Sequence, residues 1–281
     1  MARLFAWLVF GVAAGIGVVD AAFAGAVSER KAAGAARVRA RIMAEDPLNS
    51  FVIGALARIP RGGGYQTGAQ AWTRFCGEAV RWDEARGRLE MSPRAAQPSF
   101  CSVAAYFALT LALQDWERAR RVRFSREFWL YMMPVYGQAD GERGWGRLNA
   151  NGPGLAKWAR ELGSGFNFTD VRRARPGDFL KIFWTEKIGS SEFGHFVVFL
   201  GWKKDENGQW LLRFWSSNMG SGYGVKEVPL SDCKRLVFTR IHRPAAFAGF
   251  ARLPETDEWL QSLLKRGVSA SDMLQRCGVS R

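Results

Sequence analysis

The chain has 281 residues, of which 48% are hydrophobic, and it contains 12 tryptophans. This composition excludes a disordered polymer and is sufficient for one sizeable buried core. The net charge of +14 at pH 7 favours anionic partners, but no zinc-finger or RNP signature indicates specific binding of nucleic acid. We therefore expect the basic surface to attract anionic polymers of a cell envelope, and we expect the protein to be a monomer.

Residues 1–24 have the pattern of an export signal. An apolar run over residues 4–19 follows one basic residue, and the tripeptide AFA at 22–24 fits the small residues of a cleavage site. The sequence predicts export to the periplasm or the exterior. An uncleaved membrane tether is the alternative, because the run is only slightly short for a spanning helix and because the basic residues at 30–41 oppose translocation.

Changes in composition divide the rest of the chain into three parts. Residues 25–70 are predicted to form a basic, helical N-terminal extension that is broken at Pro60 and ends in a glycine-rich loop. That loop lacks the Gly-Lys-Ser/Thr sequence of a phosphate-binding loop. Residues 71–245 are predicted to form the main domain, and residues 246–281 a helical C-terminal tail.

The main domain begins with the signals of a hairpin and a long helix. Alternating character on both sides of EARG predicts a hairpin over residues 79–92. The stretch QPSFCSVAAYFALTLAL begins at Gln97 and is apolar almost without a break over residues 103–109, which predicts a helix buried on all sides. Ser99 is the expected N-cap, which places Cys101 in the first turn.

An aromatic segment and the loop NANGPG follow the long helix. The loop precedes a short predicted helix over residues 155–162, which ends at Gly163. Trp145, Asn149 and Asn151 are candidate contacts for a sugar or peptide substrate. The alternative is that these side chains only pack the glycine-rich loop.

The C-terminal half of the chain has the composition of β-strands. Residues 175–184, 194–202 and 209–218 are rich in β-branched and aromatic side chains and are separated by turn residues. Asp178 is predicted to cap backbone N–H groups in the turn that starts the first of these strands. Helices followed by an antiparallel sheet are the pattern of an α+β fold.

Four cysteines and two histidines limit the sites that the chain can build. No two cysteines have C-x-x-C spacing, so the sequence predicts neither a metal site nor another cofactor. In an exported chain, one disulfide is allowed among Cys76, Cys233 and Cys277. Cys101 differs because the positive end of a helix dipole favours a thiolate in the first turn, although most free cysteines are simply small buried hydrophobic residues.

His195 begins a predicted strand and has polar neighbours on the next one. A two-residue Asn-Gly turn at 207–208 would place His195 opposite position 220, with Ser216 and Asn218 on its face of the sheet. Asn218, one diagonal step away, is predicted to orient the imidazole, and Ser216 is the alternative. The other histidine, His242, lies just before a proline and is expected to be structural.

A cysteine at a helix start, a histidine at a strand start and an amide on the next strand are the parts of a thiol hydrolase. The thiolate attacks a carbonyl carbon, the imidazole transfers the proton, and the amide holds the imidazole in one orientation. The backbone N–H of Cys101 can donate to the oxyanion, with Gln97 as a candidate second donor.

The order Cys101, His195, Asn218 resembles that of the papain-like cysteine hydrolases. Within them, RPGDFLKIFW followed by GHFVVFLGW is similar to paired strands of the bacterial NlpC-type and CHAP cell-wall hydrolases, and FWSSNMGSGYG more loosely resembles the Asn-plus-glycine segment of papain-like peptidases. The resemblance implies a papain-like core, in which a buried helix carrying the cysteine packs on an antiparallel sheet. It implies a Cys-His-Asn triad, an acyl-enzyme, and cleavage of peptide or amide bonds, often in peptidoglycan.

The sequence departs from that pattern at two points. Phe100 precedes the cysteine where an Asp or Asn is usual, and a long insertion separates Cys101 from His195. Two alternatives therefore stand beside a cell-wall peptidase. One is a non-catalytic module that binds the wall with the same fold, and the other is an acyl transferase or lipid-directed hydrolase with the same triad.

Overall fold

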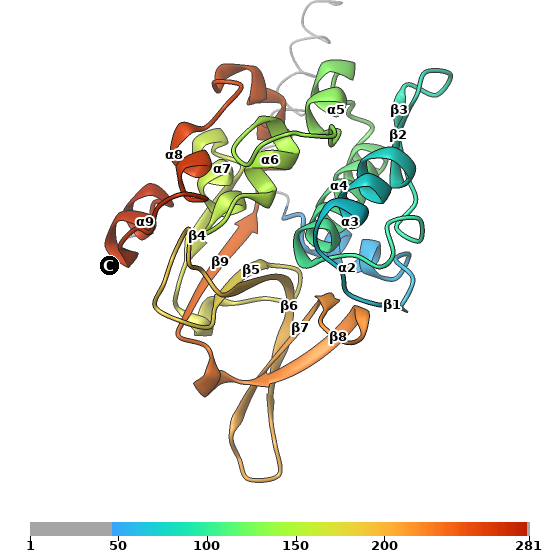
Figure 1. Cartoon of the computed structure of the whole chain (residues 1–281). Helices are drawn as coiled ribbons and strands as arrows, with labels where there is room; N and C mark the ends of the chain where they lie inside the picture. The colour runs from blue at the N-terminus through green and yellow to red at the C-terminus, as the bar shows by residue number, and fades with distance from the viewer. Residues whose placement is uncertain (1–46, 280–281) are drawn as a thin grey trace, which may run out of the picture. The chain divides into compact units, whose positions relative to one another are not determined.

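A seven-stranded antiparallel sheet organises the fold, as the computed structural model of the protein shows (Figure 1). The structure describes residues 47–279. The strand order is β1-β8-β7-β6-β5-β9-β4, and β2 and β3 form a separate hairpin. The strands are β1 (Gly62–Gly63), β2 (Val80–Asp83), β3 (Arg88–Met91), β4 (Gly165–Phe168), β5 (Phe179–Phe183), β6 (Gly194–Lys204), β7 (Trp210–Asn218), β8 (Gly222–Pro229) and β9 (Arg235–Ile241).

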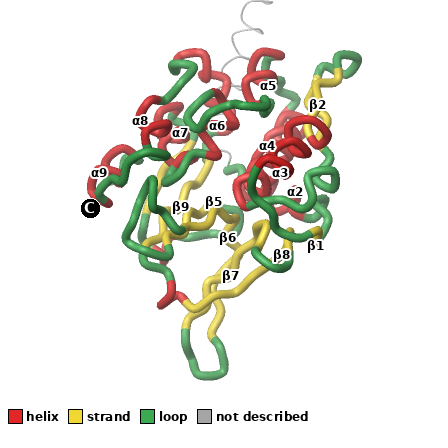
Figure 2. The backbone as a smooth tube through the Cα atoms, viewed as in Figure 1, coloured by secondary structure: helices red, strands yellow, loops and turns green. Residues whose placement is uncertain are grey.

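Helices make up much of the chain before β4, and the C-terminal part after β9 consists of short helices joined by loops (Figure 2). The α-helices are α2 (Asn49–Leu56), α3 (Ala69–Arg74), α4 (Cys101–Arg120), α5 (Arg126–Met132), α6 (Arg143–Asn149), α7 (Gly154–Leu162), α8 (Glu258–Ser262) and α9 (Ala270–Arg276). One π-helical turn, η1 (Phe75–Ala79), and three 3₁₀ segments, η2 (Val171–Arg173), η3 (Leu230–Asp232) and η4 (Pro244–Arg252), complete the list. Mixed helices and an antiparallel sheet agree with the predicted α+β class.

The predicted export signal at residues 1–24 lies outside the described residues, as does the first part of the predicted extension at 25–70. Within residues 47–279, no helix combines the length and apolarity needed to cross a bilayer. These residues belong to one unit by their internal contacts. The predicted main domain at 71–245 and tail at 246–281 therefore share one structural unit.

Helix α4 is the buried helix that the sequence predicts, and nearly all of its first 13 residues have little or no exposed surface. Its start differs from the prediction. The N-cap is Phe100 and not Ser99, because Ser99 is held in an extended conformation by backbone bonds to the loop of residues 64–66. Phe100 has no hydroxyl or carboxylate that could cap the helix. No N-cap side chain therefore accepts a hydrogen bond from the N–H groups of the first turn.

The predicted hairpin at 79–92 is confirmed as β2 and β3, but the predicted turn between β6 and β7 is wrong. Backbone bonding pairs Asp205 with Gln209 around a three-residue loop that ends in Gly208, whose φ is +77°. A bulge between Phe199 and Gly201 then shifts the pairing by one more residue. The loop and the bulge together shift the pairing of β6 with β7 by two residues from the predicted register. Because side chains along a strand alternate between the two faces of the sheet, Asn218 still lies on the same face as His195, as predicted.

The C-terminal tail packs against the same core as the sheet. Leu260, Leu263 and Met273 are buried together with Phe183 of β5 and Val237 of β9. Short helices occur within the helical stretches expected there, as α8 and α9. The predicted helix at 155–162 is confirmed as α7, which ends at Gly163 with a φ of +63°.

Asp178 is the buried anchor of the turn before β5. Its carboxylate accepts from the backbone N–H of Arg175 at 2.8 Å, which confirms the predicted capping role. It also accepts two bonds from the Arg240 guanidinium of β9, at 2.8 and 2.7 Å, and one from Asn49 of α2 at 2.8 Å. This one carboxylate therefore links helix α2, the turn and the central sheet.

Candidate active site

Cys101 is the first residue of α4, and the residue as a whole is partly exposed. The residues around it are held by backbone contacts: the Ser99 carbonyl accepts from the Gln66 N–H at 3.0 Å and from the Ser217 hydroxyl of β7 at 2.9 Å. The helix start is thus fixed between the glycine-rich loop and the sheet. The N–H of Cys101 is among the first-turn amides that have no partner within the helix.

His195 and Asn218 lie on neighbouring strands, and Nε2 of the imidazole is 3.2 Å from the Asn218 amide oxygen. The Asn218 amide donates its own protons to the carbonyls of Ser216, at 3.2 Å, and Gly224, at 2.9 Å. These bonds fix the amide oxygen toward His195, so Nε2 must carry a proton in order to donate to it. Nδ1 is then the ring nitrogen left for Cys101: it accepts a proton from the thiol and, once protonated, donates a hydrogen bond to the thiolate.

Ser216 and His242, the two alternatives of the sequence analysis, lie in other contacts. The Ser216 hydroxyl donates to the Phe196 carbonyl at 2.8 Å and does not contact the imidazole. His242 follows β9, and its ring packs edge-on against Phe166 of β4, at 5.3 Å between centroids. Asn218 is therefore the polar side chain that contacts His195 from β7.

The environment of Cys101 favours its thiolate. Burial alone would raise the pKa of the thiol, but a hydrogen bond from the His195 imidazole and its charge outweigh that effect. The charge of Lys181 and the backbone N–H of Phe196 act in the same direction. Together they lower the pKa of Cys101 from 9.0 to about 6, so most of this thiol is ionised at neutral pH.

The pKa values of the other three cysteines are shifted in the opposite direction from that of Cys101. Burial raises the pKa of Cys76, Cys233 and Cys277 to about 12 in each case. All three are free thiols, so the disulfide that the sequence allowed is not formed. Cys101 alone among the four has an environment suited to a nucleophile.

Tyr65, in the glycine-rich loop, also contacts Cys101. The pKa of Tyr65 is raised by burial, and further by the negative charge of Cys101 and by the hydrogen bond between the phenol and the thiolate. The phenol therefore donates to the sulfur when the sulfur is ionised. The loop reaches this position through Gly62, Gly63 and Gly64, all with positive φ.

A small cavity of about 130 Å³ adjoins Cys101. The end of α6 and the loop that follows it form one wall, which includes Asn149 and Asn151, and the ion pair of Lys181 and Glu192 forms part of another. The side chains of this pair are 14% and 3% exposed. Asn149 and Asn151 thus line the cavity, which is where substrate contacts are expected. Both side chains also bond within the protein: Asn149 donates to the Asp140 carboxylate at 2.6 Å, and Asn151 donates to the Gly189 carbonyl at 3.4 Å.

Trp145 and Gln97 are placed differently from their expected roles. Trp145 is 0% exposed and packs against Phe75 and Tyr106, at centroid distances of 4.6 and 5.6 Å, so its expected contact with substrate is wrong. The indole belongs to the aromatic core beneath the site. Gln97 donates from its amide to the Gly62 carbonyl at 3.0 Å and does not line the cavity beside Cys101.

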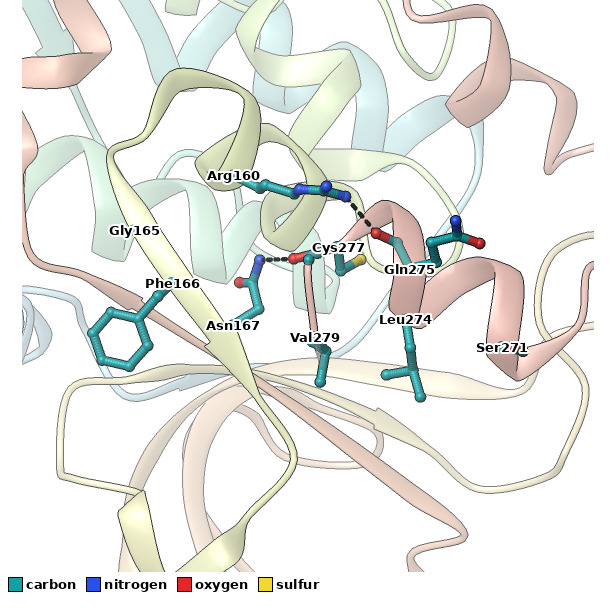
Figure 3. A pocket seen from close by; sticks show the side chains of 10 residues that line it. Arg160, Gly165, Phe166, Asn167, Ser271, Leu274, Gln275, Cys277 and Val279 are labelled. Atoms are coloured by element: carbon teal, nitrogen blue, oxygen red, sulfur yellow. Dashed lines mark hydrogen bonds between the residues drawn. The ribbon is translucent and has the colours of Figure 1, made fainter. Parts of the chain in front are cut away.

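A wider cavity, of about 590 Å³, opens between α7, β4 and α9 (Figure 3). There Asn167 donates to the Cys277 carbonyl at 2.7 Å, and Arg160 donates to the carbonyl of Gln275 (Figure 3). The described residues that line it include no histidine, and burial raises the pKa of the Cys277 thiol. This cavity therefore lacks a low-pKa thiol of the kind that lines the cavity beside Cys101.

Sequence reasoning missed Tyr65, Lys181 and Glu192. Tyr65 follows three consecutive glycines, and such a run indicates a loop that approaches other backbone closely. Lys181 is a charged residue in an otherwise apolar strand, FLKIF, which is a signal that could have been used. Glu192 carries no comparable signal, because only the fold brings its loop to β5.

Comparisons of the chain with protein-family models, with curated proteins and with solved structures found no match. Any function must therefore be argued from the site itself. The geometry brings together an oriented imidazole, a set of hydrogen-bond donors and a low-pKa thiol that lines a cavity. These are the groups that nucleophilic attack on a carbonyl carbon requires.

Proposed function

We propose that this protein is an exported thiol hydrolase that cleaves peptide or amide bonds, with cell-wall peptides as its substrate class. The observation that carries the proposal is the hydrogen-bonded series from Cys101 to His195 to Asn218. A module that only binds the wall does not need a thiol whose pKa lies near 6. The location and the substrate class rest on the sequence patterns described above.

The chemistry follows from the positions of these groups. The Cys101 thiolate attacks the substrate carbonyl carbon, and the resulting oxyanion accepts hydrogen bonds from the first-turn amide of Cys101. The imidazolium of His195 donates its Nδ1 proton to the leaving nitrogen, the C–N bond breaks, and a thioester remains on Cys101. His195 then takes a proton from water, the hydroxide attacks the thioester, and the carboxylic acid and the thiolate are released.

Two further features support a papain-like assignment. A buried helix carries the cysteine at its first residue, and an antiparallel sheet carries the histidine and the asparagine on adjacent strands. As in the Ser-His-Asp arrangement, one ring nitrogen of the histidine serves the nucleophile, and the other donates to a third group that selects the imidazole tautomer. NlpC-type and CHAP hydrolases remain the groups that its strand motifs resemble.

The test combines active-site labelling with substrate cleavage on the full chain. Iodoacetamide alkylation of Cys101, followed by peptide mass spectrometry, is expected to be half-maximal near pH 6 and to move toward pH 9 in His195→Ala. Cys233→Ala, which removes the thiol of another partly exposed cysteine, is the matched control and is expected to leave the labelling of Cys101 unchanged.

The same variants are then incubated with peptidoglycan fragments. Wild type and Cys233→Ala are expected to release new amino groups, and Cys101→Ala is expected to release none. Added amine acceptors distinguish hydrolysis from acyl transfer, because a transferase would form the new amide in place of the free acid. Labelling of Cys101 no faster than that of Cys76 at pH 7 would overturn the proposed nucleophile.

A further inference from the structure

The far end of α4 carries a surface that the proposed chemistry does not use. Two adjoining clefts of about 630 and 540 Å³ lie between this helix end and the β2–β3 hairpin, and Arg88, Gln114 and Arg118 line both. We call their joint surface the arginine groove. Seven arginines line it: Arg58, Arg81, Arg86, Arg88, Arg118, Arg121 and Arg123.

The charge of the groove is only partly neutralised. Glu78, Glu90 and Glu117 are the acidic side chains in its lining, against the seven arginines. Arg58 and Arg118 form ion pairs with one aspartate, Asp115, and Arg86 pairs with Asp83 and Glu90. Within residues 47–279, no ion pair involves the remaining four arginines, which are Arg81, Arg88, Arg121 and Arg123. All seven are solvent-exposed.

The type of cation indicates the type of partner. Every cationic side chain of the groove is an arginine and none is a lysine. A guanidinium presents a planar set of donors that matches the oxygens of phosphate or carboxylate, whereas an ammonium acts as a point charge. The groove is therefore suited to a chain of oxyanions.

The shape of the groove narrows the choice further. A flat bilayer contacts protruding side chains and cannot follow two concave clefts. Phe124 and Trp129 line the groove but are 7% and 2% exposed, so they offer no face on which a nucleic-acid base could stack. A flexible polymer without bases can place successive charges along both clefts.

We propose that the arginine groove binds a phosphodiester polymer without bases, such as a polyol-phosphate chain of a cell envelope. Helix α4 has 20 residues and is about 30 Å long, so the groove lies far from Cys101. Its role is anchoring and not catalysis. The proposal rests on the proposed export of the chain but not on the proposed hydrolase activity, because no residue of the groove belongs to the site around Cys101.

The experiment measures binding of the full chain to end-labelled poly(glycerol phosphate) over a series of salt concentrations. The groove variant is Arg88→Gln/Arg118→Gln/Arg121→Gln. The matched control is Arg175→Gln/Arg243→Gln/Arg266→Gln, which makes the same change in net charge at exposed arginines outside the groove. Equal thermal midpoints of the two variants verify that both are folded, as expected for surface substitutions.

The groove variant is expected to lose about 10-fold or more in affinity, and the slope of log Kd against log salt is expected to fall by about 2, since three phosphate contacts are removed. The control is expected to retain most of the wild-type affinity. Equal losses in both variants would overturn the proposal in favour of non-specific attraction by net charge. Tighter binding of single-stranded DNA with the same number of phosphates, or groove-dependent binding to phosphatidylglycerol vesicles, would overturn it in favour of a different partner.

Discussion

The amide oxygen of Asn218 lies 3.2 Å from Nε2 of His195, across two neighbouring strands of the central sheet. The Asn218 amide cannot rotate without losing its bonds to the carbonyls of Ser216 and Gly224. The His195 imidazole is therefore oriented by an amide whose own orientation is fixed by two hydrogen bonds. Asn218 is also buried, with only 1% of its surface exposed. An orientation set in this way is present before any substrate binds.

Loss of the orienting amide should reduce turnover without removing the nucleophile. In Asn218→Ala we expect kcat to fall about 10- to 100-fold, because an imidazole misplaced by a fraction of an ångström transfers protons poorly. Labelling of Cys101 should persist. Ser216→Ala is the matched control: its hydroxyl bonds to a backbone carbonyl, so its loss should cost about 1 kcal/mol of stability and leave kcat near the wild-type value. Equal loss of kcat in both variants would contradict the assigned role.

The ion pair of Lys181 and Glu192 should set the acidity of Cys101. The charge of Lys181 lowers the pKa of the thiol, so Lys181→Met is expected to raise that pKa above 6 and to move the alkylation profile to higher pH. Glu192→Gln removes the anion that neutralises Lys181 and is expected to move the profile to lower pH. The test is whether the alkylation profiles of the two variants move in opposite directions, because general damage to the site would shift both profiles in the same direction.

The phenol of Tyr65 should stabilise the thiolate by its hydrogen bond. In Tyr65→Phe this donor is lost, so the pKa of Cys101 should rise and the rate of labelling at pH 6 should fall, while the rate at pH 9 stays near that of wild type. Tyr136→Phe removes the hydroxyl of an exposed tyrosine and serves as the control. A Tyr65→Phe profile identical to that of wild type would show that the phenol does not act on the sulfur.

The buried pair of Asp178 and Arg240 should contribute strongly to folding. Arg240→Met leaves a carboxylate with almost no exposed surface without its cation, and we expect a loss of about 3 to 5 kcal/mol in the free energy of unfolding. The double variant Asp178→Asn/Arg240→Met should recover part of that loss, because no buried charge remains uncompensated. Urea titrations of the wild type and the two variants measure both values, and a double variant that is less stable than Arg240→Met would contradict the pairing.

Much of the fold follows from local patterns in the sequence. The unbroken apolar run of α4, the strands β5, β6 and β7, and the ends of α7 are all set by periodicity and by glycine positions. Cys101 and His195 could also be found, since each lies at the start of its element, as the first residue of α4 and the second residue of β6. Strands β8 and β9 were not predicted, because their pairing depends on the rest of the sheet.

The remaining parts of the site depend on contacts distant in sequence. Ser99 has the chemistry of an N-cap, but backbone bonds to residues 64–66 outweigh that local preference and move the cap to Phe100. Tyr65 reaches Cys101 only because the glycine-rich loop packs beside the helix start. Trp145 lies in a loop-like stretch by composition, and its burial is decided by Phe75 and Tyr106 from other elements.

The register of the β6–β7 hairpin limits which changes in its length can keep Asn218 facing His195. The wide loop at its tip and the bulge after Phe199 each displace the pairing by one residue, and together they leave the histidine facing an amide. A lineage that lost one irregularity and kept the other would bring the opposite face of β7, with Ser217, toward His195. Natural variants of this hairpin should therefore change length by two residues at a time, or carry a second compensating change, although its tip touches no reacting atom.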